Sequence, residues 1–449
     1  MNTKALRQKI LDLAIHGKLV PQDPNDEPAS VLLERIRDEK ERLIKEGKIK
    51  RPKKSKATSD KPHYENVPFE VPSSWVWTTL GEIFTLQAGK NITAKDIYTE
   101  KSEEYKYPCF GGNGIRGYVA ISNKIGEYPI IGRQGALCGN INLAHGSFYA
   151  TEHAVVVERY CDTDLMWGYY TLIALNLNQY ATATAQPGLA VNVINDVAIP
   201  LPPLHEQQRI SKSIKILFSF LDAIECEKLY LKTAISQTKT KILYLAIHGK
   251  LVPQDPTDEP ATELLKRINP NAEITSDNGH YQKLPEGWCE CSFDDIFNIT
   301  MGQSPNGSSI NHQQGVEFHQ GKILFGDKYL KQSDMFTDAP TKLATPNSLL
   351  LCVRAPVGVV NITQREICIG RGLCSLKPNA AINLDYAYHT LTTYQSDFES
   401  KSTGSTFKAI SGSIIRKEVF ALPPLKEQHR IVAKIEEIFA QLDAIEASL

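Results

Sequence analysis

The stretch Lys241–Ile268 reads KILYLAIHGKLVPQDPTDEPATELLKRI, and it has a second copy, KILDLAIHGKLVPQDPNDEPASVLLERI, at Lys9–Ile36. The two copies are identical at 23 of 28 positions. Another pair of repeats relates Leu201–Glu225 to Leu422–Glu446, with 15 of 25 positions identical. Because a repeated segment indicates a repeated structural unit, the order of these copies decides the fold.

That order predicts a circular two-fold repeat. In the middle of the chain, LPPLHEQ leads through one continuous segment into AIHGKLVPQDP. At the ends the same unit is cut, so that its second half opens the sequence and its first half closes it. Joining Leu449 to Met1 would regenerate the unit with a connection of 12 steps in place of 16. The chain therefore reads as helix, linker and globular domain, twice over.

Heptad periodicity predicts that the repeated helices pair as a coiled coil. From Ile210 to Leu245 the apolar positions alternate steps of four and three, and the terminal segments carry a matching series. Since one apolar seam needs another, we expect the two helices to lie antiparallel. A helix over residues 3–15 continues the terminal seam with Leu6, Ile10 and Leu13. The main seam consists of Ile210, Ile214, Leu217, Leu221, Ile224, Leu231, Ile235 and Ile242 on the central helix and Ile431, Ile435, Ile438, Leu442 and Ile445 on the C-terminal one.

The predicted class is α+β, with two pseudo-symmetric globular α/β domains separated by two long helices that form an antiparallel coiled-coil spacer. The two domains pair Trp75 with Trp288 and Phe84 with Phe297, and helices are expected over 164–180 and 384–400. The expected segments are a half-spacer helix at 1–20, a helical and lysine-rich linker at 21–66, domains at 67–203 and 281–424, the central helix at 204–250, a linker at 251–280 and a spacer helix at 425–449.

Composition is that of an ordinary soluble protein, with 42% hydrophobic and 22% charged residues. No signal peptide or membrane span is expected. Nine cysteines without a C-x-x-C pair indicate reduced thiols. The net charge of −1 argues against a protein that grips a polyanion over its whole surface, so nucleic-acid binding would need locally concentrated charge or charged partners.

Motifs give a poor case for an enzyme. Gly112–Gly117 matches G-x-G-x-x-G, but no helix opens there, so tight turns between strands are the better interpretation. The sequence has no P-loop, zinc pattern or G-x-S-x-G elbow. His16 and His248, at equivalent helix ends, are expected to cap carbonyl groups.

Several polar residues suit DNA instead. Arg133 and Arg354 are predicted to occupy equivalent strand ends, where an arginine either forks onto guanine or ties down a turn. Loops AQPG and TGSTFK suit phosphate contact or are plain turns, and the lysines at 48–56 form a solvated linker or contact phosphates nonspecifically. The candidate DNA-binding residues are Asn113, Arg116, Arg133, Gln134, Gln186, Gln303, Ser304, Asn306, Gln320, Arg354, Arg371, Ser405, Thr406 and Lys408.

Several motifs together carry a resemblance to a known family. They are LPPLHEQQRI and LPPLKEQHRI, the doubled AIHGKLVPQDP, GGNGIRGY, GRQGALCGN with ATEHA, and GQSPNGSS with VRAPVG and GRGL. With these motifs the chain resembles the specificity (S) subunit of type I restriction-modification systems. The resemblance covers nearly the whole chain. It implies two target-recognition domains that each read one half of a split DNA site, with helical spacers that dock two methyltransferase (M) subunits.

The resemblance further implies restriction (R) subunits in the complex, and places S-adenosylmethionine, ATP and Mg on partner subunits, with no cofactor or metal in this chain. It implies action on double-stranded DNA in the cytoplasm of a bacterial or archaeal cell, at the nucleoid. The residues alone leave two alternatives: a coiled-coil adaptor with two protein-binding domains, and a self-contained nuclease-methyltransferase, which the missing motifs disfavour.

Overall fold

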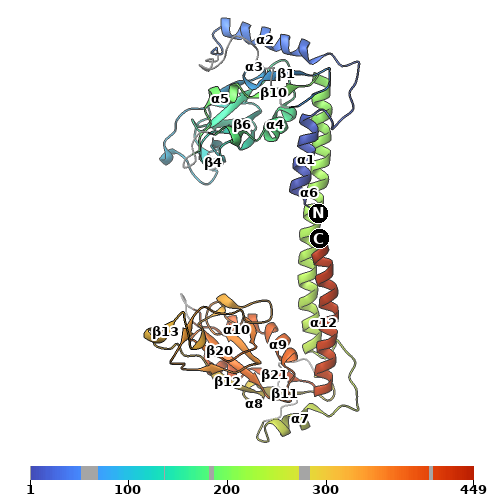
Figure 1. Ribbon diagram of the computed structural model, residues 1–449, viewed down its shortest axis with the longest axis vertical. Helices are drawn as coiled ribbons and strands as arrows, with labels where there is room; N and C mark the ends of the chain where they lie inside the picture. The colour runs from blue at the N-terminus through green and yellow to red at the C-terminus, as the bar shows by residue number, and fades with distance from the viewer. Residues whose placement is uncertain (1, 52–68, 136, 182–186, 273–283, 404–407) are drawn as a thin grey trace. The chain divides into compact units, whose positions relative to one another are not determined.

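The computed structural model describes residues 2–51, 69–135, 137–181, 187–272, 284–403 and 408–449. The chain forms two compact units, Met1–Glu227 and Lys228–Leu449. Each unit contains an α/β domain and two long helical segments that run side by side (Figure 1). Helix α6, Leu204–Ile247, begins in the first unit and ends in the second. This content of helices and strands confirms the predicted α+β class.

Domain 1 runs from strand β1 to strand β10. It is part of the first unit, and the first unit also contains helices before and after this domain. Its elements are α1 (Thr3–Ile15), α2 (Ala29–Lys45), β1 (Val76–Thr79), α3 (Leu80–Ile83), β2 (Thr85–Ala88), η2 (Ala94–Asp96), β3 (Tyr107–Gly111), β4 (Gly114–Val119), β5 (Lys124–Ile125), β6 (Tyr128–Gly132), β7 (Ile141–Ala144), β8 (Ser147–Ala150), β9 (Ala154–Glu158), α4 (Leu165–Ala174), η3 (Leu177–Tyr180), α5 (Val191–Asn195), β10 (Ala198–Leu201) and the first half of α6.

Domain 2 runs from strand β11 to strand β21. It is part of the second unit, and the second unit also contains helices before and after this domain. Its elements are the rest of α6, α7 (Ala261–Ile268), β11 (Cys289–Ser292), α8 (Phe293–Ile296), β12 (Phe297–Met301), η4 (Gly307–Ser309), β13 (Ile310–Asn311), β14 (Val316–His319), η5 (Lys322–Leu324), β15 (Phe336–Thr337), β16 (Leu343–Ala344), β17 (Ser348–Cys352), β18 (Val360–Thr363), β19 (Ile367–Ile369), β20 (Leu373–Pro378), α9 (Leu384–Thr393), α10 (Gln395–Lys401), α11 (Gly412–Arg416), β21 (Val419–Leu422) and α12 (Leu425–Ser448).

Both domains are built on the same pair of sheets. The first sheet has the order β2-β9-β6-β7 in domain 1 and β12-β20-β17-β18 in domain 2. The second sheet, β4-β3-β8-β5 or β13-β15-β14-β19-β16, contains one parallel pair, β3 with β8 or β14 with β19. The first and last strands of each domain pair antiparallel, β1 with β10 and β11 with β21. The equal order of the first sheet and the matching parallel pair confirm that the two domains share a scaffold, to which domain 2 adds the edge strand β13 in its second sheet.

Helix α1 packs antiparallel to the first half of α6. Near the start of α1, the Arg7 guanidinium lies 2.5 Å from Asp222 and 3.4 Å from Glu225. Beyond its end, the Gln22 amide donates to the Glu206 carboxylate at 2.6 Å. The start of α1 therefore meets the later part of this helical segment, and its end meets the beginning, as predicted.

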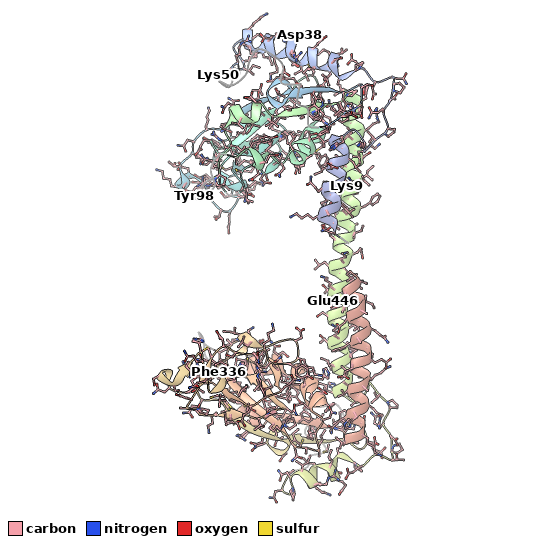
Figure 2. The ribbon with its side chains drawn as sticks, viewed as in Figure 1. Lys9, Asp38, Lys50, Tyr98, Phe336 and Glu446 are labelled. Atoms are coloured by element: carbon pink, nitrogen blue, oxygen red, sulfur yellow. The ribbon has the colours of Figure 1, made fainter. Side chains whose placement is uncertain are left out.

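Helix α12 packs antiparallel to the second half of α6 in the same way. Lys239 pairs with Asp443 and, at 3.9 Å, with Glu446, which lies near the end of α12 (Figure 2). Toward the other end of the pair, the Gln254 amide donates to the Glu427 carboxylate at 3.1 Å. Each unit therefore contains one antiparallel helix pair.

The apolar seam is buried most deeply close to the domains. Away from them, Leu231 and Ile445 are 37% and 45% exposed. The predicted seam is therefore confirmed near the domains but is open at these two positions. Its buried members are Ile210, Ile214, Leu221, Ile235, Ile242, Ile431 and Ile435, and its half-buried members are Leu217, Ile224, Ile438 and Leu442.

The buried face of α1 differs from the predicted one. Leu11 and Ala14 are its buried residues, whereas Leu6 is 38% exposed. Leu11 and Ala14 face α4 as well as α6. Because α1 packs against two helices, its buried face turns toward α4, and the prediction for Leu6 was wrong.

The repeated LPPL-x-EQ segment forms the joint between each domain and its long helix. The Gln207 side chain accepts from the Asp164 amide at 3.0 Å and donates to the Pro202 carbonyl at 3.0 Å. Gln428 makes the same two bonds in unit 2, at 2.8 Å to the Asn383 amide and 3.0 Å to a proline carbonyl. Since Asp164 and Asn383 are the N-caps of α4 and α9, the glutamines tie these helices to α6 and α12.

The repeated AIHGKLVPQDP segment forms a second joint. His16 and His248 bond through Nδ1 to the carbonyls of Asp12 and Tyr244, which confirms their predicted capping role. Farther along, the Asp26 carboxylate receives both guanidinium nitrogens of Arg209, at 3.2 and 2.6 Å. Asp258 and Arg430 repeat this pair at 2.7 Å in unit 2. The two copies of this repeated segment therefore form the same joint in each unit.

Two helices predicted as single segments are interrupted. In the segment 164–180, α4 ends before Asn176, which adopts the left-handed region at φ 45°, and η3 follows. In the segment 384–400, Tyr394 separates α9 from α10. The G-x-G-x-x-G segment forms, as predicted, a tight turn, because Gly112 and Asn113 join β3 to β4.

Domain 2 contains a partly buried ion cluster centred on Glu317 of β14. The Glu317 carboxylate accepts from Arg365 at 2.5 Å, from the Ser333 amide at 2.7 Å and from His319 Nε2 at 2.8 Å. Burial by itself would raise the pKa of Glu317, but these hydrogen bonds outweigh it and lower the pKa to about 2. The cluster holds the end of β14 against the loop that contains Ser333.

The seam yields a first prediction. Ile435→Ala should lower the free energy of unfolding of the second unit by about 2–5 kcal/mol, because Ile435 is fully buried and its truncation leaves a cavity. Ile445→Ala, on the same helix, should cost less than about 1 kcal/mol, since its side chain is already 45% exposed. Urea denaturation followed by circular dichroism measures both. Equal losses for the two variants would contradict the burial of the seam near the domain.

The Glu317 cluster yields a second prediction. Because its folded-state pKa lies below the ordinary value of 4.5, Glu317 stabilises the fold above about pH 4.5, and this stabilisation is lost as the pH falls toward 2. At neutral pH, Glu317→Gln should lower the free energy of unfolding by about 2–3 kcal/mol. The gap from the wild type should close on acidification.

Glu366→Gln is the matched control, because Glu366 is exposed and neighbours Arg365 in sequence. It removes the same charge and should change the free energy of unfolding by less than about 0.5 kcal/mol. A Glu317→Gln deficit that stays constant from pH 7 to pH 2.5 would show that the carboxylate charge is not what stabilises the loop.

Candidate nucleic-acid interface

In domain 1 the predicted polar residues gather where β3, β6 and β9 meet at one edge of the sheets. Asn113, in the exposed turn after β3, accepts from the Asn140 amide at 3.2 Å. Gly112 lies against the backbone carbonyl of Gln134, so close that a Cβ there would stand 2.6 Å from the oxygen. Arg116 is exposed on β4. The fold thus brings the turn and the Gln134 segment together.

In domain 2 the same edge carries more of the predicted residues. Gln303 and Ser304 follow β12, and the Ser304 hydroxyl accepts from the Arg371 amide at 3.4 Å. The Lys408 carbonyl accepts from the Ala355 amide at 3.2 Å. A hollow of about 140 Å³ at this edge is lined by Gln320, Gly321, Lys322, Cys352, Arg354, Ala355, Arg371 and Gly372.

The backbone register pairs Arg354 with Gln134 and not with Arg133. Gln134 forms an isolated β-bridge with Gly188, and Arg354 forms the corresponding bridge with Ala409. Gln134 and Arg354 are both exposed, whereas Arg133 is half-buried. The interpretation that the two arginines occupy equivalent places was wrong by one residue.

A shift of one residue in extended backbone turns a side chain to the opposite side. The Arg133 amide donates to the His153 carbonyl at 3.0 Å, as the Val353 amide donates to Gly372. One guanidinium nitrogen of Arg133 lies 3.5 Å from the Glu152 carbonyl. Nε of Arg133 is buried and has no hydrogen-bond partner in the described part of the chain. This position suits an arginine that ties down a turn.

Other candidates lie elsewhere. Asn306 is exposed and caps the short helix η4, where its side chain accepts from the Ser308 amide at 3.4 Å. Gln186, Ser405 and Thr406 lie outside the described residues, as do most of the two loops that contain them.

The lysine-rich segment is described only as far as Arg51. Lys48 pairs with Glu46 at 2.8 Å, and Arg51 pairs with Glu41 at 2.9 Å. These surface pairs suit a solvated linker, because both cations already have an acidic neighbour.

The sequence reasoning missed two residues at these edges and one exposed tyrosine elsewhere in domain 1. Lys322 lines the hollow of domain 2, and Glu152 follows β8 in domain 1. Aligning ATEHA with IGRGL would have found Glu152, because it places this residue opposite Arg371. Tyr98 is also exposed, stacks on Tyr105 with ring centroids 3.7 Å apart, and lies at the end of domain 1 remote from α6 (Figure 2).

The described residues offer little reactive chemistry. All nine cysteines are unpaired and seven of them are buried, as expected for reduced thiols. Burial raises the pKa of Cys289 and Cys352 to about 12, which keeps these thiols protonated at neutral pH. In the described ranges, no group of three or more His, Cys, Asp or Glu residues could hold a metal ion. No helix there is long and apolar enough to span a bilayer.

A family model for the type I restriction modification DNA specificity domain matches this chain twice, at residues 72–237 and 285–449. The first match contains domain 1 and most of α6, and the second contains domain 2 and all of α12. The circular repeat is therefore a repeat of the family's own domain.

Several relatives are specificity subunits of type I restriction enzymes from Escherichia coli. The EcoEI specificity subunit is 30% identical over an alignment of 566 positions, which covers 99% of this chain and 90% of the relative. The EcoAI specificity subunit is 26% identical, with 97% and 88% covered. The EcoprrI specificity subunit is 44% identical over 165 residues, which are 37% of this chain and 41% of the relative.

Solved structures share the fold. One, described as the structural basis of complex assembly and conformational transition of the type I R-M system, has a TM-score of 0.60 and 24% identity, covering 85% of this chain and 94% of that one. The HsdS subunit from Thermoanaerobacter tengcongensis has a TM-score of 0.51 and 22% identity, with 85% and 93% covered.

The predicted resemblance is thus confirmed over nearly the full length, with both domains matched and the relatives named as specificity subunits. This chain belongs to the family of type I restriction-modification DNA specificity subunits.

Proposed function

We propose that this chain reads an asymmetric bipartite DNA site, one half with each domain. The observation that carries this is the edge at which β3, β6 and β9, or β14, β17 and β20, meet. The first sheets of the two domains have the same strand order, yet this edge carries Asn113 and Gln134 in one domain and Gln320, Arg354 and Arg371 in the other. Equal frames with unlike hydrogen-bonding groups suit two unlike half-sites.

The chain also assembles with other subunits in this proposal: two methyltransferase subunits and the restriction subunits of a type I complex. S-adenosylmethionine, ATP and Mg would bind those partners. Support comes from α6, where Phe220, Leu229 and Tyr230 are more than half exposed. Large exposed apolar side chains such as these are available for contact with partner proteins. The complex would act in the cytoplasm, on the DNA of the nucleoid.

The net charge of −1 fits a division of labour. Phosphate contacts supply most of the nonspecific affinity of DNA-binding proteins, and they require many cationic groups. In this proposal the partners supply much of that affinity, while this chain supplies base contacts. Extrusion of the target adenine would then take place in a pocket of the methyltransferase subunit.

The test compares the purified chain with the chain assembled with its methyltransferase subunit. We expect methyl transfer to DNA from the complex only, and salt-sensitive DNA binding that is far stronger for the complex. Sequencing of the modified DNA should give one motif with two separated halves. Methyl transfer by the chain alone would contradict the division of labour, and no salt-sensitive binding in either form would favour a protein-binding adaptor.

A length variant tests whether α6 sets the gap between the half-sites. Seven residues inserted between Glu227 and Lys228 keep the heptad pattern and leave the helix contacts of both units intact. The insertion adds about 10 Å of helix, or about three base pairs at about 3.4 Å each, and about a third of a turn of DNA. The variant should lose the original site and favour a wider gap.

A two-residue insertion at the same point is the control, because it adds only about 3 Å of helix but turns the residues that follow by about 200° about the helix axis, so it should abolish methylation of the original site without creating a wider one. Full methylation of the original site by the seven-residue variant would mean that α6 serves for docking and does not measure the gap.

A further inference from the structure

The two domains differ in hydrogen-bonding character at two equivalent backbone positions. The first position is Gln134 in domain 1 and Arg354 in domain 2, as their β-bridges establish. Both side chains are exposed.

The second position is Glu152 in domain 1 and Arg371 in domain 2. The Thr151 amide donates to the Phe110 carbonyl at 3.0 Å, and the Gly370 amide donates to the His319 carbonyl at 2.7 Å. Glu152 and Arg371 are the next residues after these two amides. They therefore stand at the same place relative to the parallel strand pair of their domain.

In domain 2 both positions carry donors only. An arginine side chain has five N–H donors and no acceptor. Gln320 and Lys322 line the same hollow as Arg354 and Arg371, and its lining contains no carboxylate. In the major groove guanine presents two acceptors, O6 and N7, which a guanidinium can engage together.

In domain 1 both positions can accept. The Glu152 side chain is 37% exposed, and its Oε1 lies 3.2 Å from His153 Nε2. Its other oxygen, Oε2, is buried and has no hydrogen-bond partner in the described residues, so Oε1 carries the exposed part of the carboxylate. An ionised carboxylate repels the acceptors of guanine but accepts from the amino groups of cytosine N4 or adenine N6. Gln134, whose amide both donates and accepts, suits adenine.

We propose that the half-site read by domain 2 carries guanine at the base pairs that Arg354 and Arg371 contact, whereas domain 1 reads an amino-bearing base, adenine or cytosine, at the equivalent positions through Gln134 and Glu152. This inference rests on the proposed function, because it names the bases that the two edges select. The two halves would then differ in the group that is contacted, the O6 and N7 acceptors of guanine in one half and an exocyclic amino group in the other.

The experiment uses the full chain, co-expressed with its methyltransferase subunit in cells that lack other modification. Modified-base sequencing of the genomic DNA gives the motif for the wild type and for Arg354→Gln, Arg371→Gln and Gln134→Arg. We expect guanine in the half-site altered by Arg354→Gln. That variant should lose roughly 5- to 150-fold in discrimination at one base pair of that half. Arg371→Gln should act on a second base pair of the same half.

Gln134→Arg should act on the other half and introduce a preference for guanine there. Thermal unfolding checks each variant, and the exposed side chains should leave the melting temperature unchanged. Arg354→Lys separates base reading from charge, because lysine keeps the charge but cannot fork onto guanine. It should lose discrimination as Arg354→Gln does.

Three results would overturn the inference. One is a half-site without guanine at the pairs altered by Arg354→Gln and Arg371→Gln. Another is an even loss of methylation on all sites, which indicates a phosphate contact. The third is full discrimination by Arg354→Lys. Failure of the proposed function itself looks different, since no bipartite motif would then be found for the wild type.

Discussion

A buried glutamine at the beginning of each long helix fixes the attachment of a domain to that helix. Gln207 and Gln428 are fully buried, and each accepts from the amide of a helix N-cap residue while donating to a proline carbonyl. A buried polar group without a partner costs about 1–3 kcal/mol, so both backbone groups depend on this one side chain. An ionised glutamate could not replace it, because a carboxylate cannot donate to the carbonyl.

The neighbouring glutamate adds to the same joint. Burial raises the pKa of Glu206 and of Glu427, while the Gln22 and Gln254 amides donate to their carboxylates. Each joint thus connects the turn after one helix, the start of the next and the domain between them. With the frame fixed in this way, the edge where the inner strands meet is free to vary. A change such as Gln134 for Arg354 alters the chemistry of that edge without loosening the scaffold.

Most of the frame was predictable from the sequence because, within each unit, side chains in and just after the LPPL-x-EQ segment contact the AIHGKLVPQDP segment and the residues that follow it. The doubled LPPL-x-EQ and AIHGKLVPQDP segments identified both helix pairs, their antiparallel direction and the capping histidines. The buried face of α1 was not predictable, since it depends on the packing of Leu11 and Ala14 against α4. At the site, the gathering of Gln320, Arg354 and Arg371 follows from the order of strands, which a single sequence does not reveal.

The one-residue shift between Arg133 and Arg354 has a similar cause. Both arginines follow an apolar strand, so local pattern alone makes them look equivalent. The direction in which each arginine side chain points depends on which backbone amide donates to the neighbouring segment. That amide belongs to Arg133 in domain 1 and to Val353 in domain 2, and the acceptors are the carbonyls of His153 and Gly372, about 20 positions later. The register decides which side chain points outward. Two domains with the same backbone plan therefore expose different side chains at equivalent positions. A chain built in this way suits a DNA site whose two halves differ in sequence. If Arg354 and Arg371 contact guanine as proposed, only one orientation of the DNA places guanine acceptors against both guanidinium groups.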